Sequence, residues 1–158
     1  MKFYTSYFAM WPKLPADSMR VSISRYPPDF FKGDLPAGMF RSDLLAPSAG
    51  LLSDYKSGAV DESAYKRRYV TELAGSLYKK GFTSFESYFR RVRNIYENEV
   101  SPSYGSVIFL CYEKPGEFCH RHILADLMNM YGYDCSEFVP VPSARSAAFS
   151  AAFSAALF

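Results

Sequence analysis

The unbroken run of apolar side chains at residues 106–112, SVIFLCY, is the feature that most constrains how this chain can fold. A strand with one face in solvent alternates apolar and polar side chains, whereas a continuous run of this length is typical of a strand covered on both faces, as in a parallel sheet. An amphipathic segment follows from about Phe118 to Gly132, and residues 134–140 could form a last short strand. Strand, helix and strand in this order indicate a right-handed crossover unit, and therefore an α/β fold.

The N-terminal part of the chain predicts two more strands. Residues 2–8 are rich in Tyr, Phe and Thr, which suit a pleated strand, and residues 20–25 alternate apolar side chains with serines. Several glycines and prolines then indicate a long irregular segment over residues 29–60, with a short helix near 49–55.

Two helices are expected in the middle of the chain. The first lies between Asp61, its N-cap, and Gly81, which ends it as the C′ residue. The second starts with a T-x-x-E capping box formed by Thr83 and Glu86 and runs to about residue 99. Together these elements predict one Rossmann-like domain, with a three- to five-stranded, mostly parallel sheet and flanking helices.

Composition divides the chain into a globular domain at residues 1–142 and a tail at residues 143–158. The 158 residues are close to the roughly 150 residues of one domain, and a hydrophobic fraction of 49% excludes a disordered chain. The tail, SARSAAFSAAFSAALF, repeats A-A-F-S with a period of four. We expect it to dock onto the domain, a neighbouring protomer or a protein partner; a frayed appendage and a weak membrane anchor are the alternatives.

The cysteines and the N-terminus predict a cytoplasmic protein. Three cysteines without a C-x-x-C pair do not suit a secreted disulfide framework. Residues 1–11 are apolar but lack the small-residue cleavage pattern of a signal peptide. No stretch reaches the roughly 20 apolar residues that span a bilayer, so we expect no membrane association.

The segment 111–122, CYEKPGEFCHRH, carries the side chains best suited to chemistry. It joins the end of the predicted buried strand to the start of the next helix, where α/β proteins bind ligands and the helix dipole favours anions. Arg121 suits a clamp on phosphate or carboxylate, and His120 can carry a proton near neutral pH. Cys119 at a helix N-terminus can have a low pKa, and Glu113 can orient or deprotonate His120 or bind a ribose hydroxyl.

Each of these side chains also has a purely structural interpretation. Glu113 and Arg121 can pair simply to hold the loop, Cys119 can fill the core, and His120 can bond a backbone carbonyl. Zinc could use Cys119 with His120 or His122, but a closed zinc site needs about four ligands. We therefore expect neither a metal nor another cofactor.

Familiar catalytic loops are absent from the sequence. It contains no GxxxxGK[ST], GxGxxG or GxSxG motif. A phosphatase loop starting at Cys111 would place an arginine six residues later, where this chain has Glu117.

The same segment resembles the signature of the domain-of-unknown-function family 488. Residues 110–114 and 118–121 are similar to that family's L-C-x-E-K … C-H-R pattern, and the resemblance covers about residues 2–140. It implies a Rossmann-like α/β domain of bacteria and their phages, and it implies no particular reaction. Upstream landmarks of the family are similar to residues 4–8, 21–24, 45–48 and 55–69, and the positions that match its motif are Cys111, Glu113, Cys119, His120 and Arg121.

From these observations we expect the protein to bind a nucleotide or another phosphorylated or anionic small molecule at the Cys-His-Arg loop, with hydrolase- or transferase-type activity. His120, Cys119 and Glu113 are the predicted catalytic residues, and Arg121 and Cys111 the predicted anion-binding residues. One alternative is a non-catalytic phage or bacterial protein that binds a partner through the tail. Another is a weak nucleic-acid binder, although the formal net charge of only +2 argues against it. The basic side chains behind that alternative are Lys66, Arg67, Arg68, Lys79, Lys80, Arg90, Arg91 and Arg93.

Overall fold

The computed structural model describes residues 2–140 except 27, 32–35, 37–38 and 101–103. The tail predicted for residues 143–158 lies outside the described residues, and its docking stays a prediction. Within the described part of the chain, no helix is both long and apolar enough to cross a membrane.

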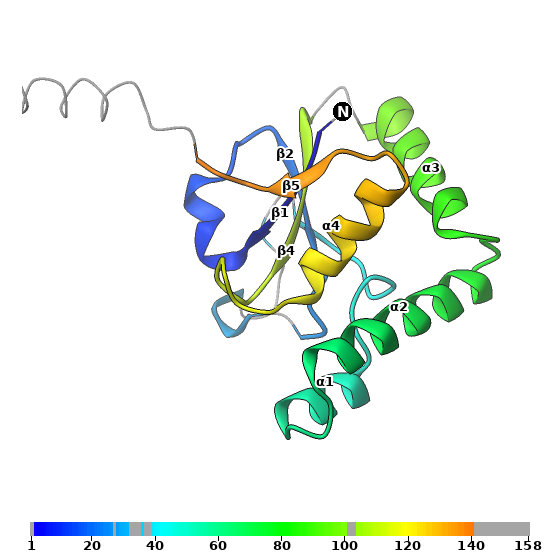
Figure 1. Ribbon diagram of the computed structural model, residues 1–158. Helices are drawn as coiled ribbons and strands as arrows, with labels where there is room; N and C mark the ends of the chain where they lie inside the picture. The colour runs from blue at the N-terminus through cyan, green and yellow to red at the C-terminus, as the bar shows by residue number, and fades with distance from the viewer. Residues whose placement is uncertain (1, 27, 32–35, 37–38, 101–103, 141–158) are drawn as a thin grey trace, which may run out of the picture.

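A five-stranded, all-parallel sheet with flanking helices forms the domain, which confirms the predicted α/β class (Figure 1). The strand order is β3-β2-β4-β1-β5, so β4 lies at the centre and pairs with both β2 and β1. The strands are β1 (Lys2–Tyr7), β2 (Ser18–Ser22), β3 (Met39–Arg41), β4 (Ser106–Cys111) and β5 (Cys135–Glu137).

The central strand β4 is covered on both faces, as its continuous apolar sequence predicts. All six of its residues are buried. Val107 and Phe109 belong to the core under the helices, whereas Ile108 and Leu110 belong to a smaller core on the opposite face. Successive side chains of a strand point to opposite faces, so a strand between two apolar layers must be apolar throughout.

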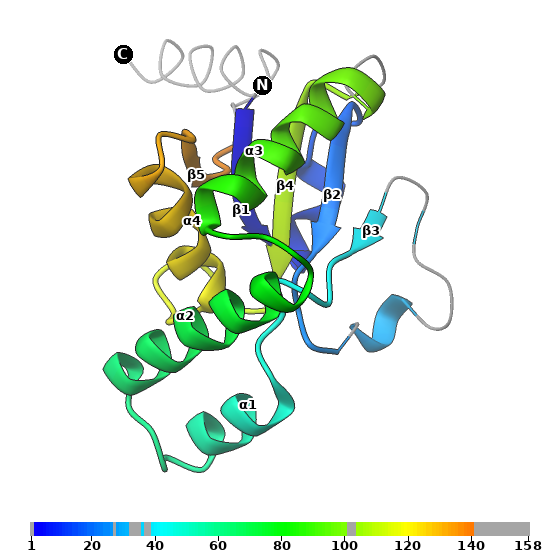
Figure 2. The same cartoon turned by 90° about the vertical axis from the view of Figure 1, so that its right-hand side faces the viewer.

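The two faces of the sheet have different covers. Helices α2 (Glu62–Lys79), α3 (Phe85–Ile95) and α4 (His120–Met130) lie on one side, and a short 3₁₀ helix, Phe8–Lys13, lies on the other (Figure 1). Helix α1 (Ala49–Lys56), expected near residues 49–55, packs against α2. In Figure 2 both α1 and α2 lie beyond the carboxyl ends of the strands, where they can enclose a site.

Helix boundaries follow local signals, with one correction. Asp61 caps α2 by accepting a hydrogen bond from the backbone N–H of Ala64, and Gly81, with a φ of 85°, follows its C-terminus as predicted. The capping box predicted for Thr83 and Glu86 is wrong. The N-cap of α3 is Ser84, one position later. The Ser84 hydroxyl accepts a hydrogen bond from the backbone N–H of Ser87, and the Ser87 hydroxyl accepts one from the backbone N–H of Ser84. A π-helical turn, Tyr96–Val100, continues α3.

The region 18–60 differs most from the sequence prediction. The second strand ends at Ser22 rather than Arg25, and the segment predicted to be irregular contains both a 3₁₀ turn, Asp29–Phe31, and strand β3. Three residues are too few for a periodic pattern to show. β3 forms because it pairs with the edge of β2, and this pairing depends on the tertiary structure rather than on the local sequence.

The buried hydroxyl of Tyr69 supplies a test of how the α1–α2 layer is held. Its oxygen donates a 2.7 Å hydrogen bond to the carbonyl oxygen of Leu45, and the side chain is 1% exposed. Tyr69→Phe leaves that carbonyl unpaired, and we expect the free energy of unfolding to fall by roughly 1–3 kcal/mol in a urea titration followed by circular dichroism. Tyr78→Phe, on the exposed side of the same helix, is the matched control. Equal stability of the two variants would contradict the prediction.

Candidate functional site

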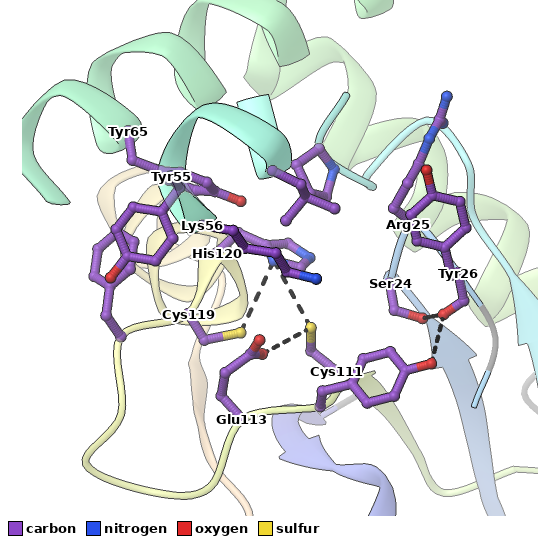
Figure 3. A pocket seen from close by; sticks show the side chains of 14 residues that line it. Ser24, Arg25, Tyr26, Tyr55, Lys56, Tyr65, Cys111, Glu113, Cys119 and His120 are labelled. Carbon is purple, nitrogen blue, oxygen red and sulfur yellow. Dashed lines mark hydrogen bonds between the residues drawn. The ribbon is translucent and has the colours of Figure 1, made fainter. Parts of the chain in front are cut away.

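A cavity of about 360 Å³ lies beyond the carboxyl ends of β2 and β4 (Figure 3). Its floor is formed by Cys111 at the end of β4, by Glu113 in the following loop, and by Cys119 and His120 at the start of α4. Helices α1 and α2 and the segment after β2 supply the walls. The position agrees with the general rule that ligands bind outside the carboxyl ends of parallel strands.

Three buried side chains meet at the floor, which we call the Cys–Cys–His cluster: Cys111, Cys119 and His120. The Nδ1 atom of His120 lies 3.8 Å from the sulfur of Cys111 and 3.9 Å from that of Cys119. The thiol of Cys111 also donates to the carboxylate of Glu113 over 3.2 Å. The structure therefore brings together four of the five residues of the predicted site (Figure 3).

The orientation of the His120 ring is fixed by the hydrogen bond of its second nitrogen, Nε2. Nε2 lies 2.8 Å from the carbonyl oxygen of Ile23, the residue directly after β2. A carbonyl can only accept, so Nε2 carries a hydrogen, and Nδ1 is the ring nitrogen that faces the two sulfurs. The ring of Tyr69, 5.4 Å away between centroids, packs against the imidazole.

The pKa values of the two thiols in the cluster are shifted in opposite directions. A hydrogen bond from Cys111 lowers the pKa of Cys119 to about 3 against the opposing effect of burial, and His120 contributes to the lowering. The same bond, together with burial, raises the pKa of Cys111 well above its ordinary value. Burial, and then the charge of Cys119, raises the pKa of Glu113. Negative charge is therefore concentrated on the Cys119 sulfur, which accepts from the Arg121 backbone N–H as the N-cap of α4.

Arg121 does not lie at the cavity, so its predicted role as an anion clamp does not agree with its position. Its side chain is 0% exposed, and its Nη1 donates a 2.5 Å hydrogen bond to the carbonyl oxygen of Glu113. Its Nε and Nη2 bind the carboxylate of Glu137 over 3.3 and 3.4 Å. The guanidinium is thus used inside the fold, where it holds the loop after β4 against β5.

Other side chains of the cavity could not be identified from the sequence. Lys56 and Tyr55 come from α1, Tyr65 from α2, and Arg25 from the segment after β2. In Figure 3 the Lys56 side chain extends from α1 across the cavity, whereas the Arg25 guanidinium is turned away from the floor. Tyr55, Lys56 and Tyr65 lie within residues 55–69, which resemble a family landmark, but that resemblance gives them no role in a site. Only the fold brings them beside the C-H-R segment.

The donor atoms of the Cys–Cys–His cluster are also close enough together that they could hold a metal ion. One donor atom from each of its residues lies within 4.8 Å of the other two. His122, which the sequence analysis considered as a zinc ligand, lies outside the cluster, and so does the third cysteine, Cys135. The ring of His122 lies 3.6 Å from Glu137, and Cys135 begins β5.

Comparison with known proteins identifies a family. A family model described as the active DUF488-N3 subclade matches residues 8–132, which include the floor of the cavity and both helices above it. No curated protein and no solved structure matches the chain.

The buried position of Arg121 predicts a structural effect of its removal. Arg121→Met leaves the Glu113 carbonyl without its donor and removes both guanidinium contacts of Glu137, which keeps the hydrogen bond from Thr5. We expect the free energy of unfolding to fall by about 3 kcal/mol in a urea titration. Arg68→Met, which breaks a surface ion pair with Asp54, is the control and should have a much smaller effect. If the two variants lose the same stability, the Arg121 contacts are not what holds the loop.

The charge on Cys119 predicts an unusual pH dependence of alkylation. Because its pKa is about 3, Cys119 stays a thiolate above that pH, so its rate with iodoacetamide should hardly change between about pH 5 and pH 8. An ordinary thiol speeds up roughly tenfold per pH unit over this range, since its pKa is about 8.5. Burial raises the pKa of Cys135 to about 12, so Cys135 should stay unmodified. Peptide mass spectrometry of the reduced, chelator-treated protein measures both rates, and a Cys119 rate that climbs tenfold per unit would contradict the prediction.

Proposed function

The chain belongs to the DUF488 family, and we propose that its cavity binds a nucleotide or another phosphorylated small molecule and promotes hydrolysis or group transfer at Cys119, His120 and Glu113. The observation that carries this proposal is the placement of a thiol–imidazole pair on the floor of a cavity with aromatic and cationic walls. The description of the matched subclade as active is in keeping with an enzyme.

The walls of the cavity suit a ligand with both a planar ring and an anionic group. Tyr55, Tyr65 and Phe118 form a contiguous aromatic wall, with ring centroids 5.1 to 5.3 Å apart. Aromatic faces of this kind stack on nucleobases and other planar rings. The ammonium of Lys56 and the N-terminus of α4 supply the attraction for an anion. The volume of about 360 Å³ is within the roughly 300–1,000 Å³ typical of small-molecule sites, which favours a single small molecule over a polymer.

The floor supplies a nucleophile and a group that can move a proton. The Cys119 sulfur attacks the electrophilic atom of the ligand and forms a covalent bond as the bond to the leaving group breaks. The proton that Cys119 has given to His120 Nδ1 passes to the leaving group. Attack by water, or by a second substrate, then releases the transferred group and restores the thiol. Glu113 holds the Cys111 thiol beside this pair.

The two alternatives have less support. Several of the basic side chains that suggested nucleic-acid binding are paired with carboxylates on the surface, among them Lys66 with Asp126 and Arg93 with Glu97. Paired charges on exposed helix faces are the ordinary arrangement of a solvated surface. Partner binding through the tail concerns residues outside the described part of the chain.

A binding panel tests the proposed ligand class. Thermal shift and titration calorimetry with AMP, GMP, CMP, UMP, adenosine and ribose 5-phosphate should show the best binding for a mononucleotide, because only a mononucleotide fills both the aromatic wall and the cationic side. A ligand at about 100 times its Kd adds about 2.7 kcal/mol to the free energy of unfolding, which is readily measured.

The matched variants are Lys56→Met, in the cavity, and Lys66→Met, on the outer surface of α2. We expect Lys56→Met to weaken mononucleotide binding about tenfold, as for the loss of one charged hydrogen bond of roughly 1.4 kcal/mol. Lys66→Met should bind like the unmodified protein. Equal affinities of the two variants, or no binding by any phosphorylated ligand, would reject the proposed ligand class.

A further inference from the structure

We propose that Cys111, Cys119 and His120 form a binding site for a thiophilic divalent cation such as Zn²⁺, and that its occupancy excludes attack by Cys119. The first half is independent of the proposed function, whereas the second half rests on it, because it assumes that the Cys119 sulfur is the nucleophile.

The distances within the cluster are close to those of a tetrahedral site. With Zn–S bonds of about 2.3 Å and Zn–N bonds of about 2.0 Å, a sulfur and a nitrogen on one tetrahedron lie about 3.5 Å apart. The two sulfurs of the cluster lie 3.8 and 3.9 Å from His120 Nδ1, and all three donor atoms lie within 4.8 Å of one another. Small side-chain movements therefore suffice to place three ligands around one ion.

The surroundings of His120 match those of a metal-bound histidine. A ligating imidazole nearly always donates its other ring N–H to a carbonyl or carboxylate, which fixes the ring and its tautomer. The bond from Nε2 to the Ile23 carbonyl does this before any metal arrives. All three ligand side chains are at most 4% exposed, so the ion would enter a site that is largely shielded from competing water.

The cavity leaves a fourth coordination position open. Two thiolates and an imidazole make a three-ligand set that, in zinc proteins, leaves one place for a further group. Here that place can be taken by the Glu113 carboxylate, whose oxygen lies 3.2 Å from the Cys111 sulfur, or by a water from the cavity. Both cysteines would bind Zn²⁺ as thiolates, so the Cys111 thiol would give up its proton on binding, and the two thiolates would balance the charge of the ion.

Metal binding and nucleophilic attack both use the lone pair of the Cys119 sulfur. The lone pair of the Cys119 sulfur cannot bond both the cation and a substrate, and His120 Nδ1 cannot both ligate and accept a proton. The metal-loaded protein should therefore lose both alkylation at Cys119 and any turnover that depends on this thiol.

Cobalt and zinc titrations of the reduced, chelator-treated full chain test the site. We expect one Co²⁺ per chain, with the intense visible bands of tetrahedral cobalt–thiolate coordination, and displacement of Co²⁺ by Zn²⁺. Cys111→Ala and Cys119→Ala should each lose these bands and the stoichiometric binding. Cys135→Ala removes the one cysteine outside the cluster and should keep both. No binding in the unmodified protein, or undiminished binding in both cluster variants, would overturn the proposed site.

Two further measurements distinguish loss of metal binding from loss of folding and test Cys119 as a ligand. Circular dichroism establishes that each alanine variant is folded, and a variant that does not fold is replaced by the corresponding serine variant. Alkylation of Cys119 in the unmodified protein should stop when one equivalent of Zn²⁺ is added and return with a chelator. Continued alkylation of the zinc-loaded protein would overturn the assignment of Cys119 as a ligand. Turnover that requires zinc would overturn both the thiol mechanism and the claim that bound metal prevents attack by Cys119, but it would leave the metal site itself intact. The result of the nucleotide binding panel does not depend on any of these outcomes.

Discussion

The hydrogen bond from His120 Nε2 to the Ile23 carbonyl is the contact on which the rest of the site depends. It ties the start of α4 to the end of β2, and β4, with Cys111 at its end, is the next strand in the sheet. Because a carbonyl can only accept, the bond also decides which ring nitrogen faces the cysteines. One backbone contact therefore sets both the position and the chemistry of the imidazole.

The residues of the C-H-R segment face two directions. Cys119, which also caps α4, and His120 line the cavity, whereas Arg121 is turned into the fold toward Glu137. Successive residues at the start of a helix are about 100° apart around its axis, so neighbours in sequence cannot all face one ligand. The buried arginine holds the loop that carries Glu113, and it therefore acts on the site through backbone position rather than by contact with a ligand.

Local sequence signals predicted the helices well because capping is a local interaction. Asp61 and Gly81 bound α2 as expected, and the error at α3 amounts to one residue in the choice of capping hydroxyl, Ser84 in place of Thr83. Strand β3 and the true end of β2 were not predictable in this way. A strand of three residues exists only when a neighbour offers its edge, and that neighbour is distant in sequence.

The sequence by itself determined the class of fold and the segment that carries the chemistry. The continuous apolar run of β4 demands two covering layers, and the segment after it must emerge at the carboxyl edge of a parallel sheet. Only the tertiary structure decided which of the five motif residues meet, because side-chain direction depends on the helix start and on the Ile23 and Glu137 partners. It also decided that Lys56, Tyr55 and Tyr65 wall the cavity, since nothing but the packing of α1 and α2 over the strand ends brings residues so far apart in sequence to one place.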